Sequence, residues 1–154
     1  MANTYSQVYI QFVFSVQNRE SIIKKDWQDR LYKYIIAIIQ NYKHKVLAIG
    51  GLPDHIHIFI GMQPTQTMSD LVQNVKRDSS KWINENHLTM GRFSWQEGYG
   101  VFSYSRSHID NVVKYILNQE EKHKNKTFIE EYKSFLDSFG VEYDPKYIFK
   151  EVKY

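Results

Sequence analysis

The sequence contains no cysteine, so it can form neither a disulfide framework nor a thiolate zinc site. It also has no apolar run that approaches the roughly 20 residues needed to cross a bilayer. The N-terminus does not show the pattern of a signal peptide. Together these absences lead us to expect a protein of the cytoplasm that has no membrane partner.

A strong net charge is missing as well, because the formal charge is only +3. Charge alone therefore does not identify a nucleic-acid-binding protein. Hydrophobic residues make up 42% of the chain and aromatic residues 16%, which indicates a globular protein and excludes a disordered one. The 154 residues contain no repeat, low-complexity tract or linker, so we expect a single domain over residues 1–154.

The basic residues gather in short local clusters. Each cluster alone is typical of a solvated surface, whereas several that converge on one groove would bind phosphate. The clusters are Lys24-Lys25, Lys43-His44-Lys45, Lys76-Arg77 with Lys81, and Lys122-His123-Lys124-Asn125-Lys126.

The most informative run is Asp54-His55-Ile56-His57-Ile58-Phe59-Ile60. Its alternation of polar and apolar residues predicts a half-buried strand with both histidines on one face. Two imidazoles placed in this way can both reach a single divalent ion. So short a motif also fits two hydrogen-bonded histidines on a sheet surface. Asp54 could orient one of these histidines or could simply cap the turn.

Residues 107–120 have the spacing of an amphipathic helix, with its apolar stripe at Ile109, Val112, Val113, Ile116 and Leu117. Tyr115 and Gln119 lie beside each other off that stripe, as residues four apart do on a helix. A tyrosine on the polar side is not needed for the core. It is either an ordinary rim residue or a nucleophilic phenol that has a metal-binding carboxamide one turn later. His123 follows Gln119 by one further turn.

These two segments, together with the block Trp95-Gln96-Glu97-Gly98-Tyr99-Gly100 between them, resemble the HUH endonuclease superfamily. Within it, the chain is similar to the small single-tyrosine transposases of insertion sequences and REP elements. Those proteins carry a His-hydrophobic-His strand and a helix with Tyr-x-x-x-Gln. The resemblance runs from the first predicted strand to about Phe149.

The resemblance implies that His55, His57 and Gln119 hold a divalent ion, Mg²⁺ or Mn²⁺, and that Tyr115 is the catalytic nucleophile. It implies cleavage and transfer of single-stranded DNA, at hairpin-forming element ends, through a 5′-phosphotyrosine link in a bacterial or archaeal cell. The ordinary pKa of tyrosine is near 10, so the ion, a base or a neighbour such as Lys114 or Lys122 must assist it. We assign DNA binding to Lys76, Arg77, Lys81 and Lys122.

The elements follow the order strand, helix, strand, strand, helix, strand, which is the split pattern of an α+β ferredoxin-like (RRM-like) fold. This pattern predicts a four-stranded antiparallel sheet with two helices on one face and the other face open for a ligand. C-terminal helices carrying the tyrosine lie outside this unit. The expected elements are strands at 5–16, 46–49, 54–62 and 98–104, and helices at 25–42, from Thr67 or Ser69 to Ile83, at 107–120, and from Thr127 to Gly140, followed by a tail that includes residues 147–149.

Residues 98–104 are aromatic and nearly uncharged, which suits an edge strand that pairs with another copy. We therefore expect a two-fold homodimer. In the resembled family the tyrosine helix is donated across the dimer, so the site is expected to combine His55 and His57 of one chain with Tyr115 of the other.

Two other function classes fit part of the pattern. A non-catalytic ferredoxin-like module could bind single-stranded nucleic acid by stacking bases on its aromatic residues. A His-x-His metalloenzyme acting on a small molecule is disfavoured, because no further His, Asp or Glu at ligand spacing completes a metal set. A covalent protein–DNA adduct separates the transposase from both alternatives.

Overall fold

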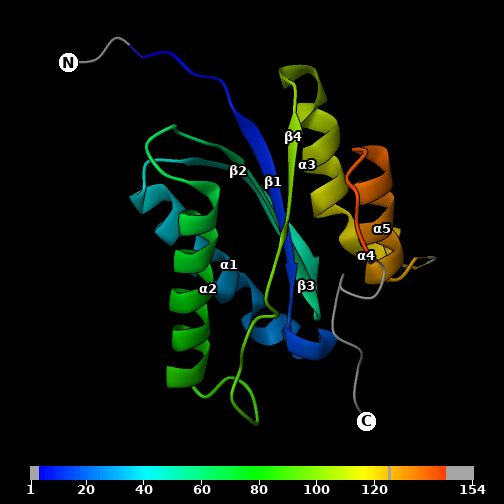
Figure 1. The fold of residues 1–154 in the computed structure, drawn as a ribbon. Coiled ribbons are helices and arrows are strands. Elements are labelled where there is room, and N and C mark those ends of the chain that lie inside the picture. The colour runs from blue at the N-terminus through cyan, green and yellow to red at the C-terminus, as the bar shows by residue number, and fades with distance from the viewer. Residues whose placement is uncertain (1–3, 125, 145–154) are drawn as a thin grey trace.

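The structure, a computed structural model, describes residues 4–124 and 126–144. A sheet of four strands forms the middle layer of the molecule, with helices on both of its faces (Figure 1). In chain order the elements are β1 (Tyr9–Ser15), η1 (Gln17–Arg19), α1 (Lys25–Asn41), β2 (Lys45–Leu52), β3 (His55–Gly61), α2 (Met68–Glu85), β4 (Gly100–Tyr104), η2 (Arg106–His108), α3 (Ile109–Leu117), α4 (Gln119–Lys122) and α5 (Phe128–Ser138).

The strands are ordered β2-β3-β1-β4 and every neighbouring pair is antiparallel. The predicted ferredoxin-like arrangement is therefore confirmed, with the histidine strand β3 in a central position. In the register of β1 and β3, Ser15 lies opposite His55 and Val13 lies opposite His57. The strand β4 is at the edge of the sheet, as expected from its sequence.

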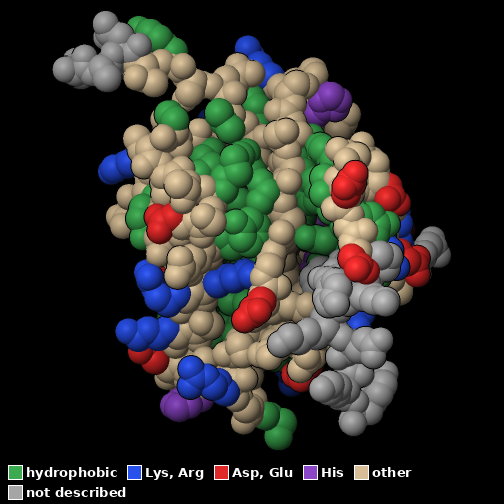
Figure 2. Space-filling model, in the orientation of Figure 1, with side chains coloured by type: hydrophobic (Ala, Val, Ile, Leu, Met, Phe, Trp, Pro, Cys, Tyr) green, Lys and Arg blue, Asp and Glu red, His purple; other side chains and the backbone are tan. Residues whose placement is uncertain are grey.

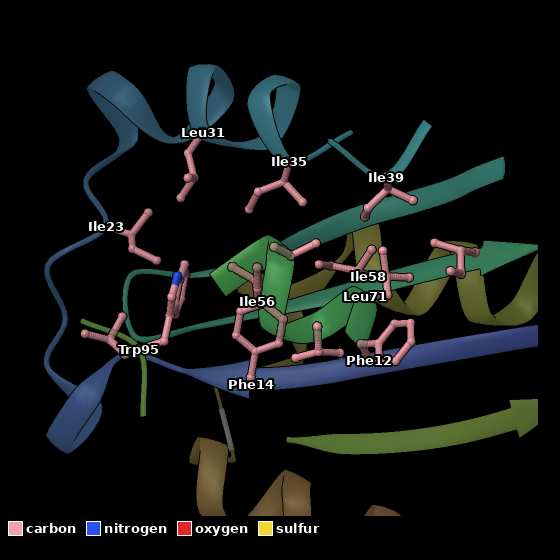
Figure 3. Packing of buried hydrophobic residues seen from close by; sticks show 14 of the residues in the cluster. Phe12, Phe14, Ile23, Leu31, Ile35, Ile39, Ile56, Ile58, Leu71 and Trp95 are labelled. Carbon is pink, nitrogen blue, oxygen red and sulfur yellow. The ribbon is translucent and has the colours of Figure 1, made fainter. Parts of the chain in front are cut away.

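The core fills the space between the sheet and helices α1 and α2 (Figure 3). The isoleucines of β3 point to this face and are fully buried, and Phe12 and Phe14 of β1 join them. Burial of one such side chain stabilises the fold by roughly 1.5–3 kcal/mol. Because side chains alternate along a strand, this packing leaves His55, His57 and Phe59 on the opposite face.

Local signals explain where the helices begin. Thr67 caps α2 by accepting a hydrogen bond from the Asp70 backbone N–H, and Thr127 caps α5 through Glu130 in the same way. Gly140 follows α5 with a positive φ of 67°, a conformation that glycine adopts at little cost. The predicted tail at 147–149 lies outside the described residues.

The expectation of an open second face is wrong. Helices α3 and α5 cover this face of the sheet (Figure 1). Their apolar stripes have to be buried, and outward residues of all four strands offer the surface that accepts them. Two clusters result: Val13, Phe102, Phe128, Tyr132 and Leu136 under α5, and Ala48, Phe59, Val112 and Ile116 under α3.

The helix predicted over 107–120 is divided in the structure. It starts as the 3-10 turn η2, continues as α3, and ends at Asn118, whose φ of −103° and ψ of 29° are not helical. Helix α3 lies very close to β2, because a Cβ at Gly50 would clash with the Ile116 carbonyl oxygen. Glycine at this position allows the end of α3, and with it Gln119, to approach the sheet. In the part of the chain that is described, no helix is long and apolar enough to cross a membrane.

Candidate metal and tyrosine site

The structure brings the four sequence-predicted site residues together within one chain. His55 and His57 are both 0% exposed beneath the C-terminal helices. The Nε2 atom of His55 lies 3.1 Å from Oε1 of Gln119. The ring of Tyr115 lies 6.0 Å from that of His57. The expected exchange of the tyrosine helix between two chains is thus not needed to bring these residues together.

Glu131 of α5 is a further member of the site. Its Oε1 atom lies 3.0 Å from Nε2 of His57 and 3.6 Å from Nε2 of His55. One ligand atom from each of the three residues lies within 4.8 Å of the others, a spacing that could hold a metal ion. The expectation that no acidic residue completes a metal set is therefore wrong.

Glu131 is far from both histidines in the sequence, so motif spacing does not reveal it. A different signal does exist. Glu131 falls on the apolar stripe of α5, between Phe128 and Tyr132, and it is only 2% exposed. Glutamate is almost never buried in this way unless it is paired.

His123 is also drawn into the site. Its Nε2 atom lies 3.1 Å from Oε1 of Glu131, and its ring centroid lies 4.8 Å from that of His55. The position one turn after Gln119 had made His123 the remaining histidine to consider. The ring of Phe128 stacks on the ring of His55, with 4.2 Å between the two ring centroids.

Outer partners determine which nitrogen of each histidine faces the centre. The Nδ1 atom of His55 donates to Oδ1 of Asp54, and Nδ1 of His57 donates to Oε1 of Gln11, both at 2.7 Å. Because each acceptor is an oxygen, a neutral imidazole keeps its proton on Nδ1 and points its Nε2 lone pair inward. The orienting role considered for Asp54 thus has the required contact.

The inward-facing atoms are mutually repulsive without a cation. The two Nε2 lone pairs face the Oε1 atoms of Glu131 and Gln119. Burial lowers the pKa of His57, which favours its neutral form. Four electron-rich atoms that converge in a buried space could hold a divalent metal ion, and the residues present fit such an ion.

The charges around Glu131 stabilise its ionised form. Burial alone would raise the pKa of this carboxyl, but the close approach of His123 and the hydrogen bond from the Tyr115 hydroxyl outweigh it and hold the pKa far below its usual range. Burial would lower the pKa of His123, yet its pairing with Glu131 raises that pKa overall. Both shifts favour the charged forms of Glu131 and His123.

The Tyr115 hydroxyl donates a hydrogen bond to Oε2 of Glu131. Burial raises the pKa of Tyr115, and the negative charge of Glu131 raises it further. The phenol is therefore neutral here. The sequence left open whether an ion, a base or a neighbour such as Lys114 or Lys122 assists this tyrosine, and the structure places a carboxylate, which can serve as a base, beside its hydroxyl.

The predicted DNA-binding residues Lys76, Arg77 and Lys81 lie on α2, across the sheet from the histidines (Figure 1). Lys76 donates hydrogen bonds to the carbonyls of Gln96 and Gly98, at 2.8 and 2.6 Å. The structure does not bring these cations together with the histidine site, and their role in DNA binding stays a prediction. The side chain of Lys122 lies outside the described part of the chain.

The family model described as "Transposase IS200 like" matches residues 4–119. The chain belongs to the IS200-like transposase family. It is accordingly an enzyme of DNA transposition, which confirms the resemblance found in its sequence. The matched segment includes His55, His57, Tyr115 and Gln119 but ends before α5, so Glu131 lies beyond it.

Individual relatives agree with this assignment. The ISDra2 transposase TnpA of Deinococcus radiodurans is 22% identical over 121 residues, which is 75% of this chain and 86% of that protein. The crystal structure of a candidate transposase from D. radiodurans R1 is similar in fold, with a TM-score of 0.63 and 20% identity over 77% of this chain and 95% of that one. A REP-associated tyrosine transposase bound to a REP hairpin has a TM-score of 0.61 and 15% identity over 100% of this chain and 93% of that one.

Proposed function

We propose that this transposase cleaves and rejoins single-stranded DNA through a covalent bond between Tyr115 and a 5′ phosphate. One observation carries the proposal: the Tyr115 hydroxyl and the inward nitrogens of His55 and His57 converge on the single carboxylate of Glu131. A nucleophile beside a metal-binding set is what phosphodiester cleavage requires.

His55, His57 and Glu131 would hold the divalent ion, with Gln119 as an additional oxygen donor. The bound ion would act as a Lewis acid toward a non-bridging oxygen of the scissile phosphate. Oxygen donors suit Mg²⁺ or Mn²⁺, and two imidazoles shift the preference toward Mn²⁺. Asp54 and Gln11 keep the two imidazoles in the tautomer that presents Nε2.

In the cleavage step, a bond forms between the Tyr115 oxygen and phosphorus, and the bond from phosphorus to the 3′ oxygen breaks. The phenolic proton passes to Oε2 of Glu131, the atom that already accepts it in a hydrogen bond. A water molecule on the opposite side of phosphorus supplies a proton to the departing 3′ oxygen, and Glu131 releases its own proton to solvent, so a free 3′ hydroxyl remains for the reverse reaction. Protonated His123 offsets negative charge at the same place.

The substrate is proposed to be single-stranded DNA at hairpin-forming element ends. The similarity in fold to a transposase bound to a REP hairpin supports this choice. We also propose a homodimer that pairs two β4 strands. In support, β4 is an edge strand, and its backbone lies at the surface with hydrophobic side chains on either side (Figure 2). Light scattering that gives the mass of one chain would contradict the dimer.

The substitution Tyr115→Phe tests the function. The variant should fold and bind DNA but form no covalent adduct with cleaved strands on a denaturing gel. Tyr34→Phe is the matched control, because the Tyr34 ring stacks on Trp82, away from this site, and should not be the nucleophile. An adduct with Tyr115→Phe would reject the assignment of the nucleophile. DNA binding without any adduct from the unsubstituted protein would favour the non-catalytic binding module.

A further inference from the structure

We propose that a cavity between α3 and α5 binds one unpaired nucleobase of the cleaved strand, in the nucleotide next to the scissile phosphate. This inference rests on the proposed function, because it assigns part of the substrate to a place beside the nucleophile. The cavity has a volume of about 370 Å³. The lining residues that we propose contact the base are Tyr104, Asn111, Phe135, Ser138 and Phe139.

The position of the cavity identifies which part of the substrate can occupy it. Tyr115 and Glu131 form part of its wall, so its occupant lies directly beside the hydroxyl that attacks phosphorus. Because they are bonded to the phosphate under attack, the nucleotides on either side of it are necessarily close to that hydroxyl during cleavage.

The chemistry of the lining suits a nucleobase. Phe139 is 39% exposed although it is large and apolar, and its ring lies 5.4 Å from that of Tyr104. Exposed aromatic rings stack with unpaired bases. The amide of Asn111 and the hydroxyl of Ser138 offer donors and acceptors for a base edge. A mostly apolar hollow with a few polar groups is the usual form of a small-ligand site.

A second cavity, of about 530 Å³, indicates where the sugar-phosphate backbone continues. It is lined by His123, Lys124 and Thr127 and is more polar than the first. Lys126 lines both cavities, so a cationic side chain stands where the strand would pass from one to the other. A phosphate beside this lysine would connect a base in the first cavity to the remainder of the strand.

The cavity is tested by filling it and by removing the base. The probe is the single-stranded DNA that flanks the gene, prepared with an abasic site at each position around the cleaved phosphate. The unsubstituted protein should form adduct about 10-fold more slowly when the abasic site is immediately beside that phosphate, since base stacking contributes about 1–3 kcal/mol. Ser138→Phe should form adduct with the intact strand about 10-fold more slowly than the unsubstituted protein does, because the new ring fills the cavity. With the abasic strand, the rate of Ser138→Phe should fall no further.

Two further variants guard against a general effect on folding. Ser69→Phe, an exposed serine at the start of α2, is the matched control and should behave as the unsubstituted protein. Asn111→Ala, which is also exposed, should reduce the preference for one base at the affected position and leave other positions unchanged. On each strand, cleavage by Ser138→Phe is compared with cleavage by the unsubstituted protein. An equal loss on the intact and the abasic strand would overturn the assignment.

A binding measurement separates this inference from the proposed function. Strands that carry 2-aminopurine beside the cleaved phosphate are titrated with Tyr115→Phe, which cannot form the adduct. Stacking on Phe139 should quench the fluorescence, and an added Phe139→Ala should remove most of the quenching. Quenching without any adduct from the unsubstituted protein would reject the proposed function alone. An adduct without quenching at either flanking position would reject the base cavity alone.

Discussion

The Tyr115 hydroxyl donates its hydrogen bond to a carboxylate, that of Glu131, which lies 16 residues further along the chain. The same carboxylate is 3.0 Å from Nε2 of His57 and 3.1 Å from Nε2 of His123. Glu131 therefore connects the nucleophile, a metal-binding histidine and a cationic histidine. A change at this residue should affect metal binding and the tyrosine together.

Glu131→Gln should lower the affinity for Mn²⁺ by more than about 10- to 100-fold, which is the loss typical when only an outer partner of a metal ligand is removed. The amide keeps the shape of the side chain but lacks the negative charge that the ion and His123 need. Covalent adduct formation should fall at least as much, because the amide also accepts the phenolic proton poorly. Calorimetric titration with Mn²⁺ measures the first effect, and Glu130→Gln, at the exposed neighbouring position, is the control. Unchanged Mn²⁺ affinity would show that Glu131 is not a ligand.

Much of this architecture could be predicted because its signals are local. The alternation over residues 54–60 placed His55 and His57 on one face of a strand, and the spacing of Tyr115 and Gln119 placed them one turn apart. The division of the helix at Asn118 does not separate this last pair in space. Gln119 still donates a hydrogen bond to the Tyr115 carbonyl, and its Oε1 reaches Nε2 of His55 on the same face of the sheet.

The remainder depends on contacts between distant segments. Glu131 meets His57 across 74 residues, and no periodic pattern encodes such a contact. The closure of the second sheet face by α5 has the same origin. A helix stripe shows that a surface must be buried, but it does not show which sheet face will accept it. The local sign of the additional ligand was Glu131 itself, a charged residue on the apolar stripe of α5.

Replacing either His55 or His57 with Ala should abolish adduct formation, as should excess EDTA. Both rings contribute an inward nitrogen to the same set, and loss of one leaves the ion with a weak site. Gln119→Ala should be milder, because it removes only a neutral oxygen donor and leaves both imidazoles and the Glu131 carboxylate in place. Gel assays over a series of Mn²⁺ concentrations measure this difference, and Gln119→Ala should regain activity at high Mn²⁺. Full activity in excess EDTA would rule out the metal-dependent mechanism.

Lys76 should give the fold a measurable pH dependence. Burial lowers the pKa of Lys76 to about 8, from 10.5 for an unburied lysine. Between these values the unfolded chain binds more protons than the folded chain, so the free energy of unfolding contributed by Lys76 rises as pH increases. Below the lower value the contribution is constant, because the amine is charged in both states.

Urea unfolding of the parent protein and of Lys76→Met across this pH range measures the effect. The difference in unfolding free energy between the two should grow in favour of the parent as pH rises. Lys81→Met is the control, because Lys81 lies on the same helix with an exposed side chain. A difference that does not change with pH would mean that the Lys76 amine is solvated and available to bind phosphate.

Mixing two inactive variants should show whether one chain contains a whole site. In the structure Tyr115 reaches Glu131 of its own chain, and its ring faces His57 of that chain. In a mixture of a His55→Ala/His57→Ala protein with a Tyr115→Phe protein, every chain then lacks either its ligands or its nucleophile. Exchange of subunits cannot repair such sites, so we expect the mixture to form no adduct. If Tyr115 were instead donated across a dimer, a mixed dimer would unite intact histidines with an intact tyrosine, and activity would return. Subunit exchange must first be verified with differently tagged chains, after which restored activity would refute the site within one chain.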